Sequence, residues 1–117
     1  MTQMVNLTPH DVNFVDQDGK ILVTIPASGT VARVSTKSTE VGGIMMDGDI
    51  TVPIHGVEYG EVIGLPPYDE NKAVYYLVSG MVAAAIPYGT RRDICIPDDF
   101  VRDEGGRIIG ARGVRLA

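Results

Sequence analysis

The chain of 117 residues has one cysteine, no tryptophan and few aromatic residues, five tyrosines and two phenylalanines. A single cysteine, Cys95, excludes a disulfide within the chain and a zinc site built from several cysteines. Its apolar context predicts a small buried residue. No apolar run approaches the roughly 18 residues that a membrane-spanning helix requires. The first residues also lack the basic start and hydrophobic stretch of a secretory signal, so we expect a cytoplasmic protein.

Motifs that indicate catalysis or metal binding are scarce as well. The two histidines, His10 and His55, lie in unrelated contexts, and no histidine or cysteine cluster has metal-ligand spacing. The serines match no nucleophile elbow, and neither a phosphate-binding glycine loop nor a dinucleotide fingerprint is present. We therefore expect no enzymatic activity, no metal and no cofactor. A small nucleotide enzyme with His10 or His55 as its base is the catalytic alternative.

Charge is distributed unevenly along the chain. The formal net charge is −5, and residues 91–117 hold six arginines against five acidic residues, a local +1, which leaves −6 for residues 1–90. An acidic protein is not expected to coat duplex nucleic acid, for which a basic domain is typical. An arginine-rich end on an acidic body instead suggests a local site for a small anion.

The first half of the chain predicts short strands separated by turns. These strands are expected at residues 12–15, 21–25, 30–35, 50–54 and 61–63. Asp18-Gly19 supplies a hairpin turn, the polar residues 37–40 predict a loop, and Asp47-Gly48-Asp49 is interpreted as a surface turn. Six glycines between residues 41 and 65 exclude a long helix, because each costs about 1 kcal/mol relative to alanine.

The second half combines the most apolar segment with one short helix. Residues 73–78 predict a central strand, and Ser79 is a candidate cap for a helix over residues 80–86 that Pro87 ends. A continuous buried strand is the alternative for that helix. Further strands are expected at 94–96, 100–102 and 107–110, with Pro97-Asp98-Asp99 as a turn or cap and Gly105-Gly106 as a hairpin turn.

Together these patterns predict one α+β domain over residues 1–117. It is mostly an antiparallel β-sheet with one or two short helices, a β-rich core over residues 1–98 and a C-terminal β-hairpin arm over residues 99–117. A chain with few aromatic residues and 14 glycines has a thin core, and such small domains gain stability by association. We therefore expect a homodimer or a higher homo-oligomer, with the C-terminal arm at the interface.

The arginines are the candidate ligand-binding residues. A guanidinium offers a planar fork of donors that fits phosphate, and an aromatic ring gives a face on which a base stacks. Glycine beside them allows close backbone approach. The alternative is a set of solvated arginines paired with the neighbouring carboxylates. The candidate ligand-binding residues are Tyr88, Arg91, Arg92, Arg107, Arg112 and Arg115.

Six segments, in this order, resemble small proteins of bacteriophages and prophages. The segments are NLTPH at 6–10, PASGTVARV at 26–34, YGEVIGLP at 59–66, YYLVSGMVAAAIP at 75–87, RRDICIPDD at 91–99 and VRDEGGRIIGARG at 101–113. Among such proteins the chain most resembles the phage Thoeris anti-defence sponge family.

This resemblance implies a function. Sponges of that family bind the cyclic ADP-ribose isomers made by bacterial TIR enzymes without cleaving them. Some members also bind the cyclic oligonucleotides of CBASS immunity, and they form dimers or higher oligomers in the infected host's cytoplasm. The resemblance implies ligand contacts from C-terminal arginines, here Arg107, Arg112 and Arg115, and from an aromatic residue. Segment 79–86 contains no phenylalanine, so that residue would be Tyr88, Tyr75 or Tyr76. A phage structural or protein-interaction protein without a nucleotide ligand is the alternative.

Overall fold

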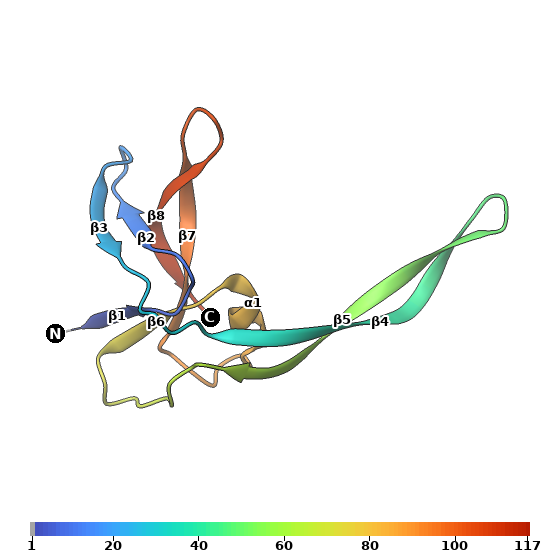
Figure 1. The fold of residues 1–117 in the computed structure, drawn as a ribbon, viewed down its shortest axis with the longest axis horizontal. Helices are drawn as coiled ribbons and strands as arrows, with labels where there is room; N and C mark the ends of the chain where they lie inside the picture. The colour runs from blue at the N-terminus through green and yellow to red at the C-terminus, as the bar shows by residue number, and fades with distance from the viewer. Residues whose placement is uncertain (1) are drawn as a thin grey trace.

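The computed structural model describes residues 2–117, and within them it contains eight β-strands and one short α-helix (Figure 1). The fold is α+β and dominated by strands, as predicted. In chain order the elements are β1 (Gln3–Asn6), β2 (Val12–Val15), β3 (Ile21–Ile25), β4 (Arg33–Met46), β5 (Ile50–Ile63), β6 (Val74–Leu77), α1 (Gly80–Ala85), β7 (Ile94–Arg102) and β8 (Ile108–Leu116).

Six of the strands form one mixed sheet, in the order β1-β6-β7-β8-β2-β3. The hairpins β2–β3 and β7–β8 are antiparallel, whereas β1 with β6, β6 with β7 and β8 with β2 run parallel. The remaining strands, β4 and β5, pair only with each other, in an antiparallel ladder. The longest ladders are therefore antiparallel, and the body of the protein is a mixed sheet.

The core lies where β6 and β7 meet the helix. Leu77, Val78 and Cys95 are fully buried, and Val82 of α1 is 2% exposed. The predicted helix is confirmed: the Ser79 hydroxyl accepts a hydrogen bond from the Val82 backbone N–H at 3.3 Å. This cap satisfies one of the free N–H groups of the first turn. The apolar strand over residues 73–78 is likewise confirmed as an interior strand of the sheet.

A long two-stranded arm, β4–β5, projects from the body (Figure 1). The predicted turn at Asp47-Gly48-Asp49 is its tip, where Gly48 and Asp49 have φ values of 84° and 60°. The predicted loop at 37–40 is wrong, and so are separate strands at 50–54 and 61–63, because each of these segments lies inside a continuous 14-residue strand. The glycines that exclude a helix do not break a strand whose backbone groups are paired across the ladder.

A C-terminal hairpin forms as predicted, with Gly106 in its turn at φ 83°. It is not a separate arm over residues 99–117, because β8 also pairs with β2 and lies inside the six-stranded sheet. Its first strand is longer than expected: residues 94–96 and 100–102 belong to one strand, so the predicted turn or cap at Pro97-Asp98-Asp99 is wrong. Proline has no N–H group to donate to a neighbouring strand. Pro97 is tolerated in β7 because the pairing of β6 with β7 ends at Cys95, so no strand lies beside Pro97 on the β6 side to accept a hydrogen bond. Strand β1 was not predicted.

Candidate functional site

A cleft of about 610 Å³ opens on the body between the loop after β1, the start of α1 and the C-terminal hairpin. Its volume lies in the range of small-molecule sites. Apolar walls come from Val78, Ile96 and Phe100 among others, and polar groups reach it from three separate parts of the chain. The polar side chains that line it are those of Thr8, His10, Asp11, Asn13, Ser79, Asp98 and Arg115.

The loop that carries His10 into this cleft is held by one buried side chain, Asn6. The Asn6 amide nitrogen donates to the backbone carbonyls of His10 at 2.8 Å and Ile25 at 3.0 Å. Its oxygen accepts from the Thr8 backbone N–H at 2.9 Å and from the Thr8 hydroxyl at 2.6 Å. Asn6 is 1% exposed, so its donors and acceptors are satisfied inside the protein. The loop is therefore rigidly placed before any ligand arrives.

Asn6 is a positioning residue that the sequence-based prediction missed. The signal lies within the Asn-Leu-Thr triplet at residues 6–8, because an asparagine whose oxygen accepts from the residue two positions later forms an Asx turn. Asp11, next along the chain, accepts from the Ala27 N–H at 2.9 Å and ties the same loop to the segment after β3. One Asp11 oxygen is thus used for structure.

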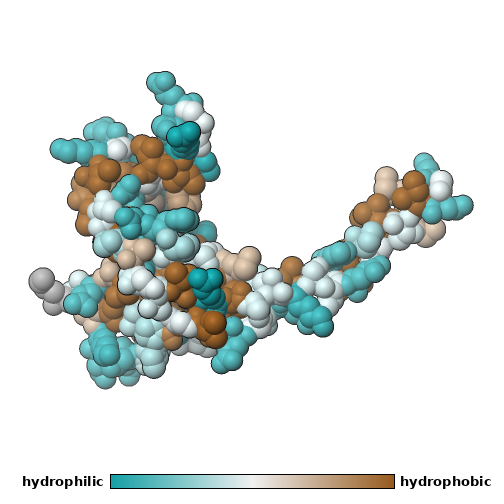
Figure 2. Space-filling view, in the orientation of Figure 1, coloured by the Kyte–Doolittle hydropathy of each residue, from teal (hydrophilic) through white to brown (hydrophobic). Residues whose placement is uncertain are grey.

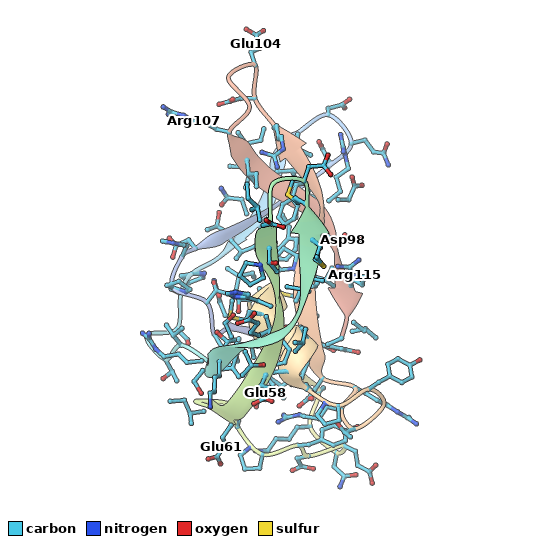
Figure 3. All side chains as sticks on the ribbon, turned by 90° about the vertical axis from the view of Figure 1, so that its right-hand side faces the viewer. Glu58, Glu61, Asp98, Glu104, Arg107 and Arg115 are labelled. Atoms are coloured by element: carbon cyan, nitrogen blue, oxygen red, sulfur yellow. The ribbon has the colours of Figure 1, made fainter. Side chains whose placement is uncertain are left out.

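Among residues 2–117, Arg115 is the only arginine that lines this cleft. It lies on β8 opposite Ile96, with Asp98 two residues further along β7 on the same face of the hairpin (Figure 3). Within residues 2–117 the Arg115 guanidinium forms no ion pair closer than 4.0 Å. Its donors therefore remain available to a ligand, with the Phe100 ring on the same wall of the cleft.

Arg91 has a structural partner instead. Its Nε and Nη2 donate to both carboxylate oxygens of Asp93, at 2.9 and 2.7 Å, and Nη1 donates to the Pro66 carbonyl at 2.7 Å. The guanidinium carbon also lies 5.6 Å from the centre of the Tyr68 ring and 5.9 Å from that of Tyr76. The fork of donors predicted to bind a phosphate is occupied by the protein itself.

Tyr88 and Arg92, the predicted ligand-binding residues next to Arg91 in the sequence, also lie outside the cleft. Tyr88 is 97% exposed in the loop after α1, so no residue in the described part of the chain covers its ring. Arg92 borders a separate, smaller hollow of about 330 Å³, which is also lined by Tyr68, Tyr75 and several acidic residues. Neither residue lines the cleft that contains Arg115.

Arg107 and Arg112 also point away from Arg115. Arg107 follows the turn of the C-terminal hairpin, near Glu104, far along the hairpin from Arg115 (Figure 3). Arg112 lies on the opposite face of β8, where it forms an ion pair of 3.4 Å with Asp99 and donates to the Gln17 carbonyl at 3.3 Å. Residues three apart on a strand face opposite sides, so strand parity could have separated Arg112 from Arg115. A single chain does not bring the six predicted residues together.

The lone cysteine is buried and unreactive in character. Cys95 has no exposed surface, and its thiol donates to the Tyr76 carbonyl at 3.6 Å. Burial, and then the nearby charge of Asp93, raise the pKa of the Cys95 thiol to about 11. The prediction of a small buried residue is confirmed.

No protein-family model, curated protein or solved structure matches this chain. Across residues 2–117 no three histidine, cysteine or acidic side chains gather in a way that would hold a metal ion. In the same part of the chain, no helix has the length and apolar character needed to cross a membrane.

Proposed function

We propose that this chain captures a small cyclic nucleotide, of the cyclic ADP-ribose isomer class, in the Arg115 cleft and holds it without breaking a bond. It would act in the cytoplasm of a phage-infected bacterium, as a sponge for an immune signal. The proposal relies on one observation: an unpaired guanidinium, Arg115, and the hydrogen-bonded His10 loop line the same cleft, which has the size of a nucleotide site.

Each part of the cleft suits one part of such a ligand. Arg115 offers a planar fork of donors for a phosphate, and a charge-assisted hydrogen bond contributes about 1.5–3 kcal/mol. Phe100 and Ile96 form an apolar wall against which a base or ribose packs, while Thr8 and His10 offer hydrogen bonds to ribose hydroxyls. Because Asn6 already orders the loop, binding would cost little additional conformational entropy.

Isothermal titration calorimetry with cyclic ADP-ribose isomers tests this function. We expect saturable binding by the native protein, and an affinity reduced by about 10- to 100-fold in Arg115→Ala, since that variant loses one charge-assisted bond. Arg92→Ala is the matched control, an exposed arginine outside the cleft, and should bind normally. Chromatography of the ligand released by denaturation should recover it intact.

Two results would contradict the proposal. Absence of binding to every isomer would exclude the ligand class, and equal affinities for the native protein and Arg115→Ala would exclude the cleft. A cleaved ligand would favour a nucleotide enzyme instead.

A second candidate function is a phage structural or protein-interaction role with no nucleotide ligand. The observation that favours it is the projecting β4–β5 arm, which a small-molecule cleft does not need. Under this alternative the nucleotide titrations show no binding to any isomer.

A further inference from the structure

The arm exposes far more surface than a chain of this size ordinarily does. The radius of gyration is 18.1 Å, compared with about 13 Å for a compact domain of this length. The accessible surface is 8345 Å², whereas a compact monomer of 12.5 kDa exposes about 6,200 Å². A two-stranded hairpin that packs on nothing is marginally stable in water. The arm therefore requires a partner surface.

One face of the outer half of the arm is apolar. In the β4–β5 register Ile44 lies opposite Val52 and Met46 opposite Ile50, so these side chains share one face of the ribbon. Ile54 lies on the same face, opposite Gly42. All five apolar side chains are between 42% and 56% exposed. Figure 2 shows hydrophobic residues gathered at the far end of the arm. We call Ile44, Met46, Ile50, Val52 and Ile54 the distal face.

A complementary hollow lies at the base of the same arm. It has a volume of about 590 Å³ and is formed where the first residues of β4 and the last residues of β5 meet α1. Val34, Ile63 and Met81 line it, and Met81 and Ile63 are 54% and 57% exposed. A chain thus has an apolar protrusion at one end of the arm and an apolar depression at the other.

We propose that two copies of this chain pair through their arms, which run antiparallel so that the distal face of each fills the basal hollow of the other. A twofold axis makes such a contact self-complementary, because each copy supplies the same protrusion and the same hollow. Each chain exposes about 2,000 Å² more than a compact monomer, so such a pairing has enough surface available to bury what an obligate homodimer interface requires. This inference does not depend on the nucleotide proposal.

Light scattering coupled to size-exclusion chromatography tests the pairing between about 1 and 100 μM. We expect the native protein to have twice the monomer mass. Ile44→Asp places a charge on the distal face and should yield monomers. Met45→Asp is the matched control, because Met45 is the adjacent residue on the opposite face of the arm and is 83% exposed. It should assemble like the native protein.

A second pair of variants tests the hollow at the base of the arm. Met81→Asp should also yield monomers, whereas Tyr88→Asp, at an exposed site outside the hollow, should not. Circular dichroism establishes that each variant keeps its strand content. A native protein that is monomeric throughout this range overturns the proposal. So does equal behaviour of Ile44→Asp and Met45→Asp, or a Met81→Asp variant that still assembles.

Discussion

The guanidinium of Arg91 donates two hydrogen bonds, of 2.9 and 2.7 Å, to the carboxylate of Asp93. The two side chains are only 13% and 8% exposed, so the pair is shielded from water. A third bond to the Pro66 carbonyl ties the segment after β5 to the start of β7. Arg91 thus joins parts of the chain that lie 25 residues apart.

Loss of this pair should destabilise the fold. Arg91→Ala leaves the Asp93 carboxylate buried without its partner, and we expect the free energy of unfolding to fall by about 3–5 kcal/mol. Arg112→Ala removes the longer and more exposed pair with Asp99 and should cost less than about 1 kcal/mol. Urea denaturation of the two variants measures the difference, and equal costs would contradict the structural role of Arg91.

The Asn6 side chain should control the order of the His10 loop. Asn6→Asp keeps an acceptor for Thr8 but removes the donors to the His10 and Ile25 carbonyls, and we expect a loss of about 1–3 kcal/mol. Hydrogen exchange at the Thr8 amide should accelerate. Asn71→Asp, in an exposed turn, is the control and should leave both the stability and the Thr8 exchange rate unchanged.

The junction of the arm with the body should tolerate no side chain at Gly64. Its φ is +81°, and an added Cβ would lie 2.7 Å from the Val31 carbonyl oxygen. Gly48, at the arm tip, has a similar φ of +84° but open space around it. Gly48→Ala should therefore cost about 1 kcal/mol from backbone strain alone. Gly64→Ala should cost at least about 1 kcal/mol more, because its Cβ also contacts the Val31 carbonyl oxygen. Calorimetry compares the melting temperatures of the two variants, and equal values would contradict the prediction.

Stability should decrease at alkaline pH in a manner that depends on Cys95. The pKa of its thiol is raised to about 11 from an ordinary value of 9.0, so the folded state holds the proton more tightly than the unfolded state does. The resulting stabilisation is complete below pH 9 and is lost as the pH rises from 9 to 11, by up to about 2 kcal/mol. Urea denaturation of the native protein and Cys95→Ala across this range isolates the thiol from the other titrating groups. Parallel pH profiles would contradict the prediction.

Local features of the fold were predictable because adjacent residues encode them. The turn at Asp18-Gly19, the Ser79 cap and the Gly105-Gly106 turn each depend on a few neighbouring side chains and backbone angles, and each forms as predicted. The length of β4 and β5 was not predictable in this way. Polar residues 37–40 resemble a loop in isolation, and they become a strand because residues 55–58 pair with them.

The sequence predicted that arginine would be part of the candidate site, but not which residues come together there. Arg115 was among the predicted ligand-binding residues and lines the cleft, whereas His10 and Asn13 were not among them and line it as well. Arg91 and Arg112 are engaged by Asp93 and Asp99. Strand parity separates Arg112 from Arg115, but the local sequence does not show that Arg91 is engaged by the Pro66 carbonyl. Which guanidinium remains available depends on the register of β7 with β8 and on the approach of Pro66.

The amino-acid sequence by itself determined the turns at Asp18-Gly19 and Gly105-Gly106, the cap of the helix and the most buried strand, since these follow from backbone preferences and short-range hydrogen bonds. The tertiary structure alone decided that β4 and β5 leave the body as an arm, that one arginine faces the cleft, and that Asn6 holds the loop opposite it. Those outcomes depend on pairing between residues far apart in the chain, which a local pattern does not specify.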